Sequence, residues 1–85
     1  MTPREIKIIT AILEVAHNLN GGQMTETLLH AEVNLHVTPT AGLHEFEAAL
    51  EICNSRGWLI GVPSKFKGRK WNISDAGEAA RLEMR

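Results

Sequence analysis

The chain has 85 residues, which is enough for one domain and too few for two. Hydrophobic residues make up 44% of it and charged residues 22%, a balance typical of globular proteins that excludes wholesale disorder. The formal net charge of −1 excludes the overall basic excess of many nucleic-acid-binding proteins, so any such function needs a local basic patch.

Cysteine content and the first residues of the chain indicate a compartment. The single cysteine, Cys53, cannot form an intramolecular disulfide, which fits a reducing environment. The first residues mix apolar side chains with Lys7 and Glu14, unlike the apolar run of a signal peptide. No stretch approaches membrane-spanning length. We therefore expect a cytoplasmic protein with no membrane partner.

The first helix is marked by its capping residues. Thr2 precedes Pro3 directly and Glu5 by three residues, which is a capping box with proline at the first helical position. We expect this helix to run to about Leu19, where Asn20-Gly21-Gly22 supplies a stop. Its apolar residues cover about half of the circumference, more than the roughly 100° that a one-sided helix needs. One stripe is expected to pack on the third helix. The other needs the second or fourth helix, or a second subunit, and gives a candidate homodimer interface of Ile8, Ile12, Val15 and Leu19.

Two further helices are predicted before residue 58. The second begins at Thr25, because Met24 and Leu29 have the spacing of a hydrophobic staple around that cap. Its expected apolar stripe is Leu28, Leu29 and Val33. The third begins within 38–40 and ends at Gly57, where glycine favours a C-terminal cap. Its expected core-facing stripe is Leu43, Phe46, Leu50 and Cys53.

After the third helix the period of the apolar residues changes from helical to extended. Residues 58–62 form a short run rich in strand formers, and residues 70–73 alternate polar and apolar. Residues 63–69 are predicted to be the tip of a hairpin between these strands. Trp58 and Trp71 are expected to face one another across it. A last short helix is predicted from Asp75 to about Met84, capped by Ser74.

This order of elements, and the local sequence, resembles the winged helix-turn-helix superfamily. The resemblance covers nearly the whole of 1–85 and implies a single α+β domain with three helices, a two-stranded β-hairpin wing and a short C-terminal helix. It also implies that 25–57 is the helix-turn-helix, with the third helix as the candidate reader of the major groove, and that 64–70 is the wing. The residues that carry it are Ala49-Leu50, Arg56-Gly57-Trp58-Leu59, the basic loop and Trp71-Asn72-Ile73-Ser74-Asp75-Ala76-Gly77.

The first functional hypothesis is a small DNA-binding protein of the transcription-regulating kind, with double-stranded DNA as its partner. Cations of the wing are expected to neutralise phosphates, and side chains near the start and on the outer face of the third helix are expected to lie nearest the bases. Ala41 and Ala48 would then meet thymine methyl groups. The expected phosphate contacts are Lys65, Lys67, Arg69 and Lys70, with Phe66 among them. The expected groove contacts are Thr38, Thr40, Ala41, His44 and Ser55.

The alternative is a winged-helix protein–protein interaction module that binds no nucleic acid. Glu45, Glu47 and Glu51 make the third helix unusually acidic, and three carboxylates near a polyanion are repelled. Such a face would instead dock on a basic partner. The connection 34–37 is also longer than the tight turn usual in the superfamily and has no glycine. Fold alone does not separate the two hypotheses.

Catalysis and metal binding are not expected. Four histidines, His17, His30, His36 and His44, fall on different predicted elements and none has the i, i+4 spacing of a zinc-binding helix. No serine or cysteine has an activating partner, and no glycine-rich phosphate loop is present. The sequence therefore predicts no enzyme activity, no catalytic residue, no metal and no cofactor.

Overall fold

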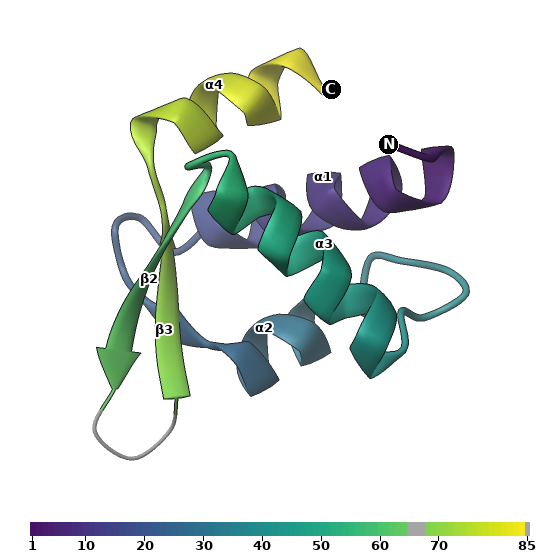
Figure 1. The fold of residues 1–85 in the computed structure, drawn as a ribbon, viewed down its shortest axis with the longest axis horizontal. Coiled ribbons are helices and arrows are strands. Elements are labelled where there is room, and N and C mark those ends of the chain that lie inside the picture. The colour runs from purple at the N-terminus through teal and green to yellow at the C-terminus, as the bar shows by residue number, and fades with distance from the viewer. Residues whose placement is uncertain (65–67, 85) are drawn as a thin grey trace.

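The computed structural model describes residues 1–64 and 68–84. Within them the chain is a small α+β domain, as predicted, and Figure 1 shows the β hairpin along one side of the packed helices. Helices and strands follow the order α1 (Pro3–His17), β1 (Met24–Thr25), α2 (Glu26–Val33), α3 (Leu43–Ser55), β2 (Leu59–Ser64), β3 (Gly68–Ile73) and α4 (Asp75–Glu83). No helix in these ranges combines the length and apolarity needed to cross a bilayer.

The sheet has one strand more than the sequence predicted. Its order is β1-β3-β2, and both pairs are antiparallel, so β3 is the central strand. The predicted hairpin is confirmed as β2 and β3, with Leu59 opposite Ile73 and Ser64 opposite Gly68. The additional strand β1 places Met24 opposite Trp71. Two residues are too few to show an alternating pattern, which is why the sequence did not reveal β1.

Three capping predictions are confirmed because caps depend only on neighbouring residues. Thr2 and Glu5 form the reciprocal capping box of α1, with the Glu5 amide 3.1 Å from the Thr2 hydroxyl. Thr25 caps α2, and Ser74 caps α4 by accepting from the Gly77 amide at 3.0 Å. Helix α1 ends at His17, two residues earlier than expected, and Asn20 continues the turn with φ of 53°.

Helix α1 lies at the centre of the core, contacted by α2, α3, α4 and β3. Ile8 and Ile12 are completely buried and Val15 is 7% exposed, while Leu19 lies half-buried beyond the helix end. The prediction that Ile8, Ile12, Val15 and Leu19 form a homodimer interface is therefore wrong, because these residues do not form an exposed surface. The wide apolar arc of α1 exists because this one helix is covered on several sides by its own chain.

The start of α3 was placed too early in the sequence. The helix begins at Leu43 with Gly42 as its N-cap, and residues 38–42 belong to the connection from α2. Asn34 holds that connection, since its side chain accepts from the Ala41 amide at 2.8 Å and donates to the Ala41 carbonyl at 3.1 Å. The sequence placed the helix start within 38–40, but tertiary hydrogen bonds hold this segment outside the helix.

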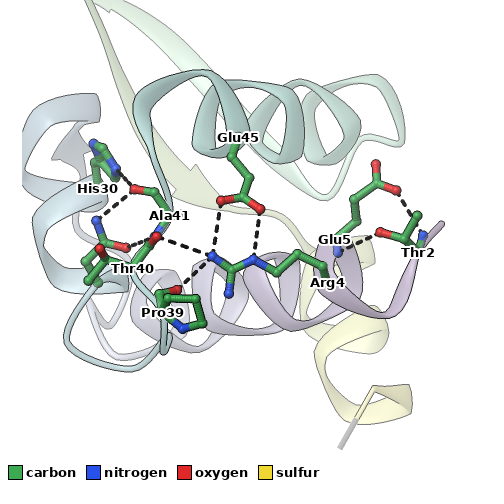
Figure 2. Close-up of polar contacts among 9 residues, drawn as sticks. Thr2, Arg4, Glu5, His30, Pro39, Thr40, Ala41 and Glu45 are labelled. Atoms are coloured by element: carbon green, nitrogen blue, oxygen red, sulfur yellow. Dashed lines mark hydrogen bonds and ion pairs between the residues drawn. The ribbon is translucent and has the colours of Figure 1, made fainter.

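Side chains of α1 and α2 complete the anchoring of the α2–α3 connection, as Figure 2 shows. Arg4 donates to the Pro39 carbonyl at 2.7 Å and forms a two-point ion pair with Glu45, with N–O distances of 2.8 and 3.1 Å. His30 donates from Nε2 to the Ala41 carbonyl at 2.7 Å, the role that a carbonyl partner requires of this nitrogen. The connection is thus held by side chains of α1, of α2 and of the α2 C-cap, Asn34.

Two predicted apolar stripes are also corrected. Leu43 lies in the first turn of α3 and is 57% exposed, and Ala49 joins Phe46, Leu50 and Cys53 as the buried face. On α2, Leu28 is likewise 57% exposed, while Leu29 and Val33 are buried. Both leucines therefore lie on the surface, although their spacing fits the buried stripe.

The two tryptophans do not face one another across the hairpin. Trp71 lies opposite Gly61 and is 1% exposed. Its ring occupies the space that a side chain at position 61 would take. A Cβ at Gly61 would lie 2.9 Å from two atoms of that ring. Trp58 precedes β2, is half-buried, and has the Arg56 guanidinium 5.3 Å from its ring centroid.

Candidate functional site

Two adjoining hollows lie between α2, α3 and β3. The first has a volume of about 300 Å³ and the second about 250 Å³. Glu26 and Glu47 line both, so the two hollows are neighbours, and together we call them the acidic groove. The residues that line it are Glu26, Thr27, His30, Leu43, Phe46, Glu47, Leu50, Glu51 and Arg69.

The carboxylates of the acidic groove come from two helices. Glu26 is the first residue of α2, while Glu47 and Glu51 are four residues apart on α3 and so share one face of that helix. Like charges at this spacing destabilise a helix by roughly 0.2–0.5 kcal/mol. The Glu47–Glu51 pair therefore does not stabilise α3. Together with Glu26, these side chains concentrate negative charge at one place on the surface.

Apolar side chains lie beneath the acidic groove and at one end of it. Phe46 is 1% exposed and Leu50 is 3% exposed, and the His30 ring stacks on Phe46 with centroids 4.6 Å apart. Leu43 adds an exposed apolar side chain at one end of the groove. The groove thus has a polar, acidic part between Glu26, Glu47 and Glu51 and an apolar part at Leu43, which suits a ligand that carries both basic and apolar side chains.

Arg69 is the cation of the groove. Its guanidinium carbon lies 4.5 Å from the centroid of the Trp71 ring, Nε lies 3.6 Å from Glu26, and Nη2 lies 3.9 Å from Glu51. Trp71 in turn donates from Nε1 to the Glu26 carboxylate at 3.1 Å, which fixes that carboxylate beside the ring. The strand β3 thus supplies both the cation and the aromatic surface beneath it.

The structure separates the residues that were expected to contact DNA. Ala41 is 3% exposed and both of its backbone polar groups are bonded, so the prediction that it meets a thymine methyl group is wrong. Thr38 and Thr40 are exposed, but they lie in the α2–α3 connection, at the opposite end of the domain from the hairpin (Figure 1). His44 and Ser55 are exposed on α3, one near each end of the helix.

The predicted wing cations are also divided. Arg69 faces Glu26 and Glu51, while Lys70 is exposed on β3. Lys65, Phe66 and Lys67 lie outside the described residues. The four expected phosphate contacts are therefore not a single set of equivalent charges, because Arg69 already has acidic neighbours on its own chain.

One of the three glutamates predicted to form the acidic face has a structural role. Arg4 pairs with Glu45 at two points, and this contact holds the pKa of Glu45 below its ordinary value. Glu47 and Glu51 remain, and Glu26 joins them from α2. The sequence signal for Glu26 was its place in the first turn after the Thr25 cap, but only the packing of α2 against the sheet brings it to α3.

Two of the four histidines have structural contacts, and the cysteine is buried. His17 lies 2.8 Å from Glu78, and His30 bonds the α2–α3 connection. Among the residues that the structure describes, no three His, Cys, Asp or Glu side chains are placed to hold a metal ion. Burial raises the pKa of Cys53 to about 12, so its thiol stays protonated at neutral pH and is a poor nucleophile.

Comparisons with protein-family models, with curated proteins and with solved structures give no match to this chain.

Proposed function

We propose that this chain is a winged-helix domain whose acidic groove binds a basic segment of a partner protein. The observation that carries the proposal is the convergence of Glu26, Glu47 and Glu51 between α2 and α3, with exposed apolar surface beside them at Leu43. In a winged-helix protein that reads DNA, this helix would approach the phosphates. Here it presents carboxylates, which a polyanion repels and a basic segment complements.

The winged-helix part of the proposal is supported by topology. A first helix, a short strand, two further helices and a hairpin follow one another in the chain, and the short strand pairs with the second strand of the hairpin. The α2–α3 connection remains longer than the usual tight turn. Its anchoring by Arg4, His30 and Asn34 supports a fixed angle between the two helices all the same.

The dimensions of the groove indicate the size of the ligand. Hollows of about 300 and 250 Å³ hold a few side chains, which fits a short extended segment or one face of a helix. Interfaces of this size lie at the small end of specific contacts and are generally transient. We therefore expect a dissociation constant on the order of micromolar at physiological salt.

Fluorescence anisotropy tests the proposal with three labelled probes. The first is a peptide of alternating basic and apolar residues, the second is the same peptide with glutamine at each basic position, and the third is a random DNA duplex. We expect the basic peptide to bind, with an affinity that falls as salt screens the charges, and the glutamine peptide to bind at least ten-fold more weakly.

The duplex makes DNA binding an outcome of the same experiment. Lys70 is exposed, and Lys65 and Lys67 stand beside it in the sequence, so the wing offers cations for a polyanion. Duplex binding that disappears when all three lysines are changed to alanine, together with no binding of the basic peptide, would overturn the proposal. The domain would then be a DNA-binding winged helix that uses its wing.

A further inference from the structure

Arg69 occupies the acidic groove in a manner that resembles a ligand more than a structural ion pair. Its guanidinium lies over the Trp71 ring and between carboxylates of two helices, Glu26 on α2 and Glu51 on α3. Arg69 itself comes from β3, at the hairpin position opposite Pro63. An arginine of the chain thus stands where the proposed function places a basic side chain of the partner.

The ion pairs of Arg69 are longer than those of two other arginines. Arg4 lies 2.8 Å from Glu45, and Arg81 lies 3.1 Å from Glu14. The corresponding distances for Arg69 are 3.6 and 3.9 Å, beyond the roughly 2.7–3.2 Å of N–H···O hydrogen bonds. Its side chain is also 43% exposed, so water reaches it. The guanidinium of Arg69 is stacked on the ring but is not hydrogen-bonded to either carboxylate.

The backbone of Arg69 accounts for this incomplete fit. The residue is paired in the ladder between β2 and β3, which fixes its Cα and limits where the guanidinium can lie. The Glu26 carboxylate is fixed as well, since it accepts from Trp71 Nε1 at 3.1 Å. An arginine that enters from solvent is not held by the β2–β3 ladder, so it can align its planar fork with the fixed carboxylate.

We propose that Trp71, Glu26 and Glu51 form a guanidinium-selective subsite, and that Arg69 is an internal stand-in that an arginine of the partner displaces. The inference rests on the proposed function and names the side chain that the groove recognises. An aromatic face with a carboxylate at its edge selects arginine over lysine, because a guanidinium stacks and donates two parallel hydrogen bonds while an ammonium is a compact point charge.

The proposal is tested by removing the stand-in. Arg69→Ala and Arg69→Gln each remove the guanidinium from over the Trp71 ring; alanine clears the ring face, while glutamine leaves a shorter, neutral side chain that an incoming arginine can move aside. The matched control is Arg56→Ala, which removes the same charge and a comparable stacking contact, on Trp58, outside the acidic groove. Two labelled peptides serve as probes, identical except that one carries arginine and the other lysine at each basic position.

We expect Arg69→Gln to bind the arginine peptide about three- to ten-fold more tightly than the unsubstituted protein, with a smaller gain for the lysine peptide. Arg56→Ala should change both affinities by less than about two-fold. Circular dichroism melting curves establish that each variant is folded, and a poorly folded Arg69→Ala leaves the glutamine variant to decide.

Two results would overturn the inference, and they differ from failure of the proposed function. If Arg69→Gln binds no more tightly than Arg56→Ala, Arg69 is not a displaced stand-in. If the arginine and lysine peptides gain equally, the subsite is not selective for guanidinium. Both results leave peptide binding by the unsubstituted protein intact. Absence of any peptide binding by that protein would instead remove the proposed function, and this inference with it.

Discussion

At Gly77 the backbone of α4 approaches the connection between α3 and β2 more closely than a side chain allows. A Cβ built there would lie 2.1 Å from the Trp58 carbonyl oxygen and 2.7 Å from a side-chain carbon of Ile73. A backbone oxygen cannot move aside as a flexible side chain can. This contact lets α4 pack against the base of the hairpin, where the Trp58 carbonyl also accepts from the Ser74 amide at 3.0 Å.

Gly77→Ala should therefore destabilise the domain by more than about 3 kcal/mol, through overpacking against backbone. A loss of stability would be informative, because helix propensity alone favours alanine over glycine by about 1 kcal/mol and so predicts a gain. Gly42→Ala is the matched control, since nothing lies within 4 Å of a Cβ at Gly42. Urea unfolding measures both free energies, and equal stability of the two variants would contradict the close approach.

Single residues were predictable from sequence where their role depends on immediate neighbours. The caps at Thr2, Thr25 and Ser74 are of this kind, and all three are confirmed. Ala41 and Arg69 are not, because Asn34 bonds the backbone of Ala41 from seven residues away and the Arg69 guanidinium lies beside Glu26 of α2. Their assignment as DNA contacts assumed that a polar or small residue in an irregular segment is free to meet a ligand.

Helices α1 and α4 are joined by a row of charged side chains. His17 and Glu14 of α1 face Glu78 and Arg81 of α4, with N–O distances of 2.8 Å for His17–Glu78 and 3.1 Å for Arg81–Glu14. The hydrogen bond from His17, with a further contribution from Arg81, holds the pKa of Glu78 below its ordinary value. Arg81 is 8% exposed, so these contacts lie at the edge of the core.

The lowered pKa of Glu78 gives the stability a pH dependence of defined sign. A carboxyl group with a depressed pKa in the folded state stabilises the fold above its unfolded value of about 4.5, and that contribution is lost as pH falls through the folded value. Glu78→Gln should therefore be less stable than the unsubstituted protein at pH 6, and the difference should shrink below about pH 4.5.

The exposed Glu83→Gln serves as the control for that measurement, because it removes a carboxylate from the same helix without this network. Thermal unfolding followed by circular dichroism from pH 3 to pH 7 compares the three proteins. A difference between Glu78→Gln and the unsubstituted protein that stays constant across this range would show that the α1–α4 contact does not depend on the Glu78 charge.

At the scale of elements, the sequence missed the shortest segment. Periodicity predicted α1 and α3, capping residues predicted α2 and α4, and the change of pattern after Gly57 predicted β2 and β3, so β1 is the one element of the described residues that was not predicted. Strand β1 has two residues and exists because Met24 pairs with Trp71 across the sheet. The start of α3 was misplaced because side chains of α1 and α2, rather than local capping, hold residues 38–42.

The central position of α1 leads to a prediction about the whole molecule. Ile12 is completely buried within one chain, so Ile12→Asp places a carboxylate in the core and should unfold the domain, at a cost of more than about 4 kcal/mol. Residues at a subunit interface behave differently, since their substitution leaves a folded monomer. Circular dichroism with light scattering distinguishes these outcomes, and a folded variant of reduced mass would restore the homodimer interpretation.

The candidate site was predictable from sequence only in part. The acidic character of α3 was evident, and Glu47 and Glu51 do line the groove. Its other components depend on tertiary structure. Glu26 reaches the acidic groove because α2 packs against the sheet, where Trp71 Nε1 donates to its carboxylate. The guanidinium of Arg69 lies in the groove because it stacks over the Trp71 ring. No spacing in the sequence relates positions 26, 51 and 69.

The most direct test of the central claim reverses the charge of the groove. Glu47→Lys with Glu51→Lys is compared with Glu32→Lys with Glu83→Lys, which makes the same change of net charge at exposed positions outside the groove. The binding of the basic peptide is measured at physiological salt. We expect the groove variant to lose at least ten-fold in affinity, about 1.4 kcal/mol, while the control loses less than about three-fold. Equal losses in the two variants would show that the peptide responds to net charge alone, and would contradict the acidic groove as its binding site.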